Sequence, residues 1–184
     1  MNEGGPRGNG PLIEVRGLNK NFGPIPALAG VDLELAGGQV VGLLGENGCG
    51  KTTLLKVLAG VMQDHAGHVR IAGRRLGPGT KACVSFLPDA SYLKDSATVS
   101  QCIGMFSDFF SDFRADKASD MIKFFGLAEN MKLKQMSKGM REKAQIALAM
   151  SRDAKVFLLD EPISGVDPAA RDVILKGIVR NLEA

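Results

Sequence analysis

A glycine-rich loop between two apolar segments carries the residues best suited to bind phosphate. Residues 45–52 read GENGCGKT and satisfy the pattern GxxxxGK[ST]; such glycines let backbone amides, and the amides that open the following helix, surround an anion. Lys51 is expected to reach the β- and γ-phosphates, and Thr52 to bind Mg²⁺. The loop therefore predicts a site for ATP or GTP. The other residues expected to contact the nucleotide here are Asn47, Gly48, Cys49, Gly50 and Thr53.

A pair of carboxylates follows a second apolar segment. Asp160 and Glu161 come directly after residues 155–159, KVFLL, and the carboxyl ends of parallel strands form the sheet edge at which ligands bind. Asp160 is expected to hold Mg²⁺ directly or through water, and Glu161 to polarise a water that attacks the γ-phosphate. Two acids after a strand are by themselves more often a solvated loop or a helix cap, so the pair is informative only together with the phosphate loop.

These residues need strands and helices that position them. Residues 40–44, VVGLL, are apolar throughout and predict a strand covered on both faces. Apolar residues recur at helical spacing from Leu54 to Met62, which predicts an amphipathic helix after the loop. Residues 12–15 and 31–35 predict half-buried strands separated by a turn-rich segment, and residues 68–72 and 84–87 predict further short strands.

The second half of the chain is expected to be mostly helical. Helical periodicity extends from about residue 98 to residue 150 and contains six of the nine phenylalanines. These six phenylalanines fit either the core of the helical segment, which is favoured, or an exposed surface that binds a partner. The pattern returns to strand at residues 155–159, and Asp167 and Pro168 predict the N-cap and first position of a last helix that runs towards Leu182.

Composition limits the class of protein. A chain of 184 residues with 45% apolar and 23% charged residues is typical of one folded domain. The net charge of +3, without a basic run, argues neither for nor against nucleic acid. The sequence holds no apolar segment long enough to cross a bilayer, and residues 1–10 read as a flexible tail rather than a signal peptide. We therefore expect a soluble, intracellular protein whose three cysteines are reduced thiols.

From about Leu12 to Ala184, the chain resembles the ATP-binding subunit of an ABC transporter. Besides the phosphate loop and the acidic strand end, residues 136–140, MSKGM, resemble the family signature LSGGQ, and residues 163–168 resemble the loop after the catalytic glutamate. Phe22 resembles the aromatic residue on which adenine stacks. The resemblance implies an α/β fold with a P-loop NTPase core, a mainly parallel sheet, an N-terminal antiparallel β subdomain and an inserted helical subdomain.

The resemblance also implies a function and partners. It implies an ATPase that uses ATP and Mg²⁺, lies in the cytoplasm on the inner face of the cell membrane, and powers a separate membrane-spanning permease, with no nucleic acid as partner. In the family, two such domains pack head to tail, so each nucleotide lies between the phosphate loop of one copy and the signature of the other. Ser137 and Gly139 would then contact the neighbouring copy's nucleotide, since a helix N-terminus favours anions. A simple N-cap at Ser137 accounts for the same residues equally well in isolation.

Three departures from the family pattern change the expectations. The signature reads Met, Lys and Met where the family has Leu, Gly and Gln, a form that resembles the multidrug and antibiotic exporter branch; Lys138 could add a contact to phosphate. Asp89 stands where the family has a glutamine, and we expect it to approach Mg²⁺ through water and to serve catalysis. The family's switch histidine falls after Ala184, and neither His65 nor His68 can replace it. We therefore expect a C-terminally truncated chain that retains nucleotide binding better than turnover.

Two other functions stay open. One is a soluble ABC-type ATPase that acts on ribosomes or other macromolecules without a membrane partner, although the coiled coil typical of chromosome ATPases is absent from the sequence between the phosphate loop and the signature. The other is a regulatory nucleotide-binding module without turnover, which Glu161 argues against. Within the loop, Cys49 is either a small space-filling residue or a thiol whose alkylation blocks ATP binding.

Overall fold

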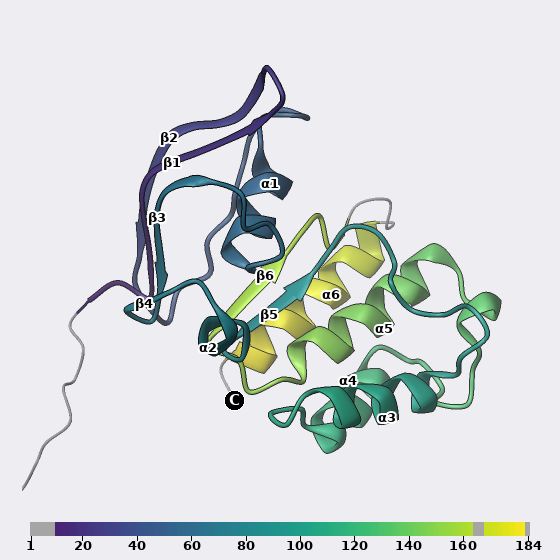
Figure 1. The fold of residues 1–184 in the computed structure, drawn as a ribbon. Coiled ribbons are helices and arrows are strands. Elements are labelled where there is room, and N and C mark those ends of the chain that lie inside the picture. The colour runs from purple at the N-terminus through teal and green to yellow at the C-terminus, as the bar shows by residue number, and fades with distance from the viewer. Residues whose placement is uncertain (1–9, 164–167, 183–184) are drawn as a thin grey trace, which may run out of the picture. The chain divides into compact units, whose positions relative to one another are not determined.

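The computed structural model describes residues 10–163 and 168–182, which fall into two compact units that divide after Ala82 (Figure 1). The predicted tail, apart from residue 10, and the predicted N-cap Asp167 lie outside the described residues. Among the described residues, none of the helices combines the length and apolar character that a membrane span requires.

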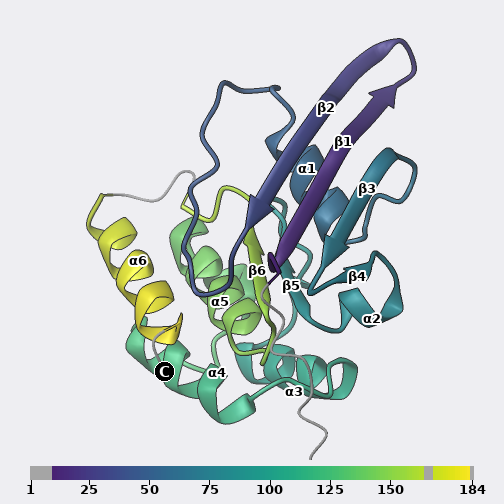
Figure 2. The same ribbon diagram turned by 90° about the vertical axis from the view of Figure 1, so that its left-hand side faces the viewer.

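An antiparallel sheet with two helices forms the first unit. The strands are β1 (Ile13–Phe22), β2 (Ile25–Leu35), β3 (Ala66–Ile71) and β4 (Arg74–Arg75), in the order β2-β1-β3-β4 (Figure 2). The helices are α1 (Lys51–Leu58) and α2 (Pro78–Lys81). Alternate residues of β1 and β3, such as Val15 and Ile71, are fully buried, as expected for strands with one covered face. Helix α1 buries Leu54, Val57 and Leu58 and contacts β2.

Three local expectations for this unit were wrong. The segment expected to be turn-rich belongs to the hairpin, whose two-residue turn begins at Gly23 with a φ of 58°, a value that favours glycine in such turns. Residues 40–44 form no strand and their side chains are exposed, because a strand needs a hydrogen-bonded neighbour and no described strand pairs with this run. Helix α1 ends at Leu58 rather than Met62, and Gly60 follows with a left-handed φ of 67°.

A two-stranded parallel sheet and a group of helices form the second unit. Strands β5 (Val84–Leu87) and β6 (Val156–Leu159) pair in register, with Val84 opposite Val156. The helical elements are α3 (Val99–Phe109), α4 (Ala115–Phe124), the 3₁₀ helix η1 (Leu133–Gln135), α5 (Lys138–Met150) and α6 (Pro168–Leu182). Helix α5 is attached to β5 by the Ser85 hydroxyl, which donates to the carbonyl oxygen of Ala149 at 2.7 Å.

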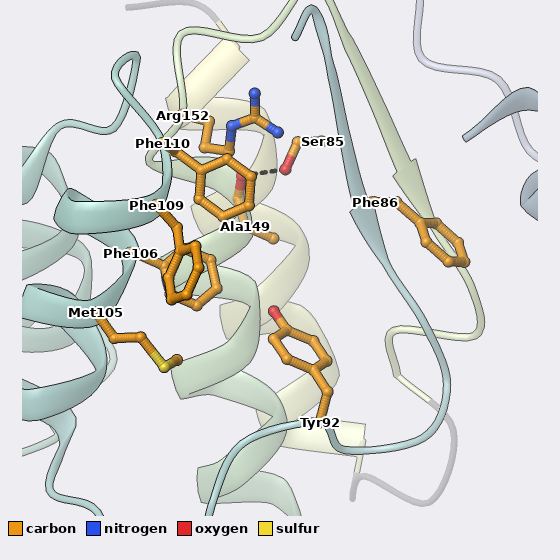
Figure 3. Close-up of a pocket in the computed structure, with 9 residues that line it drawn as sticks. All are labelled: Ser85, Phe86, Tyr92, Met105, Phe106, Phe109, Phe110, Ala149 and Arg152. Carbon is orange, nitrogen blue, oxygen red and sulfur yellow. Dashed lines mark hydrogen bonds between the residues drawn. The ribbon is translucent and has the colours of Figure 1, made fainter. Parts of the chain in front are cut away.

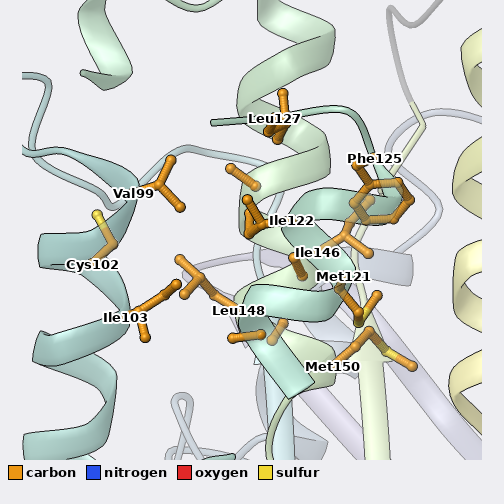
Figure 4. Packing of buried hydrophobic residues seen from close by; sticks show 14 of the residues in the cluster. Val99, Cys102, Ile103, Met121, Ile122, Phe125, Leu127, Ile146, Leu148 and Met150 are labelled. Carbon is orange, nitrogen blue, oxygen red and sulfur yellow. The ribbon is translucent and has the colours of Figure 1, made fainter. Parts of the chain in front are cut away.

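One apolar core joins the helices of the second unit. Figure 4 shows Val99 and Ile103 of α3 facing Ile122 of α4 and Ile146 and Leu148 of α5. Of the phenylalanines expected to form either core or partner surface, Phe106 and Phe125 are buried, whereas Phe109 is 78% exposed. These phenylalanines therefore contribute both to the core and to the surface.

Candidate nucleotide site

The phosphate loop of the first unit is held against the hairpin. Gly50 is the N-cap of α1 with a φ of 96°, and a Cβ added there would lie 2.4 Å from the carbonyl oxygen of Ala27 in β2. The ammonium group of Lys51 donates to the carbonyl oxygens of Gly45 at 2.8 Å and Glu46 at 2.7 Å. Lys51 therefore places its positive charge over the loop that it closes.

The residues around that lysine leave the loop open to a ligand. Asn47, Gly48 and Cys49 are exposed, and Gly48 adopts a left-handed φ of 83°. Thr52 and Thr53, in the first turn of α1, are partly exposed. An exposed glycine-rich loop that runs into a helix N-terminus fits a polyphosphate, because amides and the helix dipole favour negative charge there.

Phe22 belongs to the same unit. It is the last residue of β1, next to the hairpin turn, and is 50% exposed. It pairs with Ile25, two positions from Ala27, whose carbonyl oxygen approaches Gly50. The hairpin thus connects the candidate adenine-stacking residue to the phosphate loop. The stacking role itself stays a prediction.

The predicted carboxylates of the second unit meet at one cavity. The ladder between β5 and β6 continues beyond the strands, because the amide of Asp160 donates to the carbonyl oxygen of Leu87 at 2.9 Å. Asp89, Asp160 and Glu161 line a cavity of about 10 Å³, room for a single water molecule. Asp160 is only 3% exposed. Glu161 has a φ of 48°, a strained value for a residue with a side chain and one often found at functional sites.

Two residues that sequence reasoning missed complete this carboxylate cavity. Glu142 and Gln145 of α5 line it, and the buried Oε2 of Glu142 and Oε1 of Gln145 have no hydrogen-bond partner among the described residues. Burial raises the pKa of Glu142, and the charge of Asp89 raises it further, while Lys138 opposes both effects. Helical spacing of three residues places both side chains on one face of α5. The sequence could indicate that shared face, but not that it meets the ends of β5 and β6.

The donors present fit a magnesium ion. Asp160 and Asp89 of the second unit offer carboxylate oxygens at the cavity. Mg²⁺ prefers oxygen ligands and is usually held by one or two carboxylates together with substrate phosphates. Within the described residues, no three His, Cys, Asp or Glu side chains are grouped so that they could hold a metal by themselves.

The signature residues begin a helix, as expected. Ser137 is the N-cap of α5, and its hydroxyl accepts a hydrogen bond from the amide of Met140 at 3.3 Å. Gly139 lies in the first turn, while the exposed Lys138 forms an ion pair with Glu142 at 3.8 Å. This capping accounts for Ser137 without a ligand, so its contact with a neighbouring nucleotide stays a prediction.

Comparisons with known proteins match the chain to one family. A family model described as ABC transporter matches residues 28–164. An Fe³⁺ ions import ATP-binding protein of Mesorhizobium japonicum is 32% identical over 94% of this chain and 51% of its own length. A Nod factor export ATP-binding protein of Ralstonia nicotianae is also 32% identical, over 91% of this chain and 54% of its own length.

Solved structures agree with the sequence relatives. The structure of an ATP binding subunit of an ABC transporter superposes with a TM-score of 0.82 at 26% identity, and the match covers 94% of this chain and 75% of that one. The chain spans about half the length of the curated relatives that it matches.

Proposed function

The chain belongs to the ABC transporter family of ATP-binding domains, and on this premise we propose that it binds and hydrolyses MgATP to power a separate membrane-spanning permease. The observation that carries the proposal is the carboxylate cavity, where Asp89, Asp160 and Glu161 gather at the ends of β5 and β6. A module that only bound nucleotide would have no use for a strained glutamate beside a buried aspartate.

Each proposed role follows from the chemistry of a side chain. Lys51 and the loop amides bind the phosphates, and Lys51 exchanges the carbonyl oxygens that it now contacts for phosphate oxygens. Asp160 and Thr52 hold Mg²⁺, with Asp89 approaching through water; the ion, when bound, neutralises charge that develops during phosphoryl transfer. Glu161 accepts a proton from the attacking water. Phe22 stacks on the base.

A second copy completes the proposed site. Ser137 and Gly139 open α5, and the first amides of any helix lack partners within that helix. We propose that they bind the γ-phosphate of a nucleotide held by the neighbouring copy, so ATP joins two copies and hydrolysis releases them. The second copy is either another molecule of this chain or a related ATPase subunit.

An apolar pocket in the second unit is the proposed docking place of the permease. It has a volume of about 260 Å³, and Figure 3 shows Tyr92, Phe106 and Phe109 around it, with Arg152 at one end. Phe109 is 78% exposed and Tyr92 is 45% exposed. We propose that a short helix of the permease fills the pocket, which would hold the chain at the cytoplasmic face of the membrane. The exporter-like signature leads us to place the chain in the export branch, although relatives include both import and export proteins.

The central test uses Glu161→Gln, which keeps the size of the side chain but removes the base. We expect hydrolysis to fall by 10²-fold or more in this variant, in line with the usual contribution of one positioned base, and a dimer to accumulate with MgATP in size-exclusion chromatography. Lys51→Ala is the matched control, and it should lose ATP binding and the dimer together. Wild-type turnover in Glu161→Gln would remove Glu161 from the mechanism.

A separate experiment tests the permease against the soluble alternative. The pocket variant Phe109→Ala should keep ATP binding but no longer co-purify with membrane fractions that retain the wild-type chain. If the wild-type chain and Phe109→Ala both co-purified with ribosomes, the soluble ATPase would be favoured instead.

A further inference from the structure

Lys20 lies close to the ring of Phe22, and the proposed chemistry gives this lysine no role. It is 8% exposed, and its ammonium nitrogen lies over the Phe22 ring, 5.2 Å from the centroid. The same nitrogen donates to Oδ2 of Asp64 at 2.9 Å. Burying a lysine is costly without an anionic partner and further stabilising contacts, so this arrangement needs both Asp64 and the ring.

Asp64 is the anionic partner of this ammonium group. It lies in the segment that joins α1 to β3, and its own side chain is almost fully exposed. The hydrogen bond from Lys20 and the charge of Lys20 lower the pKa of Asp64, so the carboxylate stays ionised at neutral pH. The ion pair therefore ties the end of the hairpin to the segment that follows the phosphate-loop helix.

A cation near an aromatic ring affects what that ring can bind. The ammonium group attracts the π-electrons, holds the ring in place, and leaves it better able to stack on an electron-rich purine. Half of the surface of Phe22 stays exposed, which leaves part of the ring accessible to a base. Stacking of a base on an aromatic side chain is typically sensitive to removal of that side chain.

We propose that Lys20 is a positioning residue for nucleobase recognition, which orients and polarises Phe22 from behind. The inference rests on the proposed function, because it needs a nucleotide whose phosphates occupy the loop at Gly50. The hairpin supplies the connection, since Lys20 pairs with Leu28 and the neighbouring Ala27 approaches Gly50. The hairpin and the phosphate loop that it contacts, both in the first unit, would thus bind the base and the phosphates of one nucleotide.

The test separates the base from the phosphates. Affinities for ATP and for inorganic triphosphate are measured by calorimetry for the wild-type chain and for Lys20→Met, which keeps the length of the stem but removes the charge. We expect ATP affinity to fall about three- to tenfold, the range of a partly desolvated cation–π contact, while triphosphate affinity stays unchanged. Lys20→Arg should restore ATP affinity, because a guanidinium group can contact both Asp64 and the ring.

Phe22→Ala distinguishes failure of this inference from failure of the proposed function. If Phe22→Ala weakens ATP binding but Lys20→Met does not, the inference is wrong and the base site stands. If Lys20→Met weakens triphosphate binding as much as ATP binding, Lys20 merely supports the fold and the inference is equally overturned. If Lys20→Met fails to fold, Asp64→Asn serves in its place. It too should lower the affinity for ATP and leave the affinity for triphosphate unchanged. No binding of either ligand to the wild-type chain would contradict the proposed function itself.

Discussion

At Gly50 the backbone turns with a φ of 96° directly below the carbonyl oxygen of Ala27. Alanine there would meet two obstacles, because its Cβ would lie 2.4 Å from that oxygen and an L-residue rarely adopts this φ. We therefore expect Gly50→Ala to move the hairpin away from the loop. Affinity for ATP, measured by calorimetry, should fall at least tenfold.

Gly48 offers a matched control in the same loop. It has a similar φ of 83°, but a Cβ added there would meet no atom within 4 Å. Gly48→Ala thus carries the backbone strain alone, of about 1 kcal/mol, and should weaken ATP binding less than Gly50→Ala. Equal losses in both variants would show that the contact with Ala27 is irrelevant.

Glu142 gives a prediction about stability and pH. Burial and the neighbouring Asp89 raise its pKa in the folded chain, so folding favours the protonated form. This contribution to stability is fully present below the pKa of an unfolded glutamate and is lost as the pH rises through the higher folded value. Glu142→Gln cannot ionise, so its melting temperature should exceed that of the wild-type chain at pH 8. The difference should shrink to nothing on acidification.

The exposed carboxylate of Asp108 on α3 provides the comparison. Asp108→Asn should leave the melting temperature within about 1 °C at every pH, as expected for a change to an exposed side chain. A Glu142→Gln variant that melts below the wild-type chain at pH 8 would mean that the ionised carboxylate is needed by the fold.

Among the elements, α5 is fixed at its C-terminal end by a buried ion pair. Arg152, whose side chain is 6% exposed, contacts both carboxylate oxygens of Asp112 at 3.0 Å and donates to the carbonyl oxygen of Val84 at 2.8 Å. Removing one partner of a buried pair leaves an uncompensated charge. Arg152→Met should therefore lower the free energy of unfolding by roughly 3 kcal/mol in urea.

An exposed pair nearby sets the baseline. Arg114 and Asp116 are in contact at 2.9 Å, but both are more than half exposed, so Asp116→Ala should lower the free energy of unfolding far less than Arg152→Met does. If both variants lost the same small amount, the pair at Arg152 would contribute no more than a surface contact.

The elements also show how far the sequence could be interpreted. Strands β5 and β6 were predicted nearly to the residue, because each is a short and mainly apolar segment that ends before a proline or an acidic residue. The apolar run at residues 40–44 has the same local character, yet it is no strand, since pairing depends on a neighbour that local sequence does not specify. The phosphate loop could be found because its residues are contiguous. Glu142 and Lys20 could not, because their importance depends on residues distant in the sequence.

At the scale of the whole molecule, the proposed machinery is divided between the two units. The phosphate loop and Phe22 belong to residues 1–82, whereas the carboxylates and the signature belong to residues 83–184. The two proposed phosphate contacts, at the loop and at the start of α5, should therefore respond differently to protein concentration. Binding to the loop needs one copy, while a contact between α5 and a neighbour's nucleotide needs two.

Hydrogen exchange in the Glu161→Gln variant measures both contacts at once. With saturating MgATP, amides of residues 46–53 should gain protection to the same extent at every protein concentration. Amides of residues 138–140, at the start of α5, should gain protection only as the concentration passes the dimer dissociation constant, because association shifts with mass action.

Ser137→Ala, which removes the N-cap, should lower protection at α5 and leave the loop unchanged. Protection of α5 that is independent of concentration would place the contact within one copy, and no protection at any concentration would refute the role proposed for the signature.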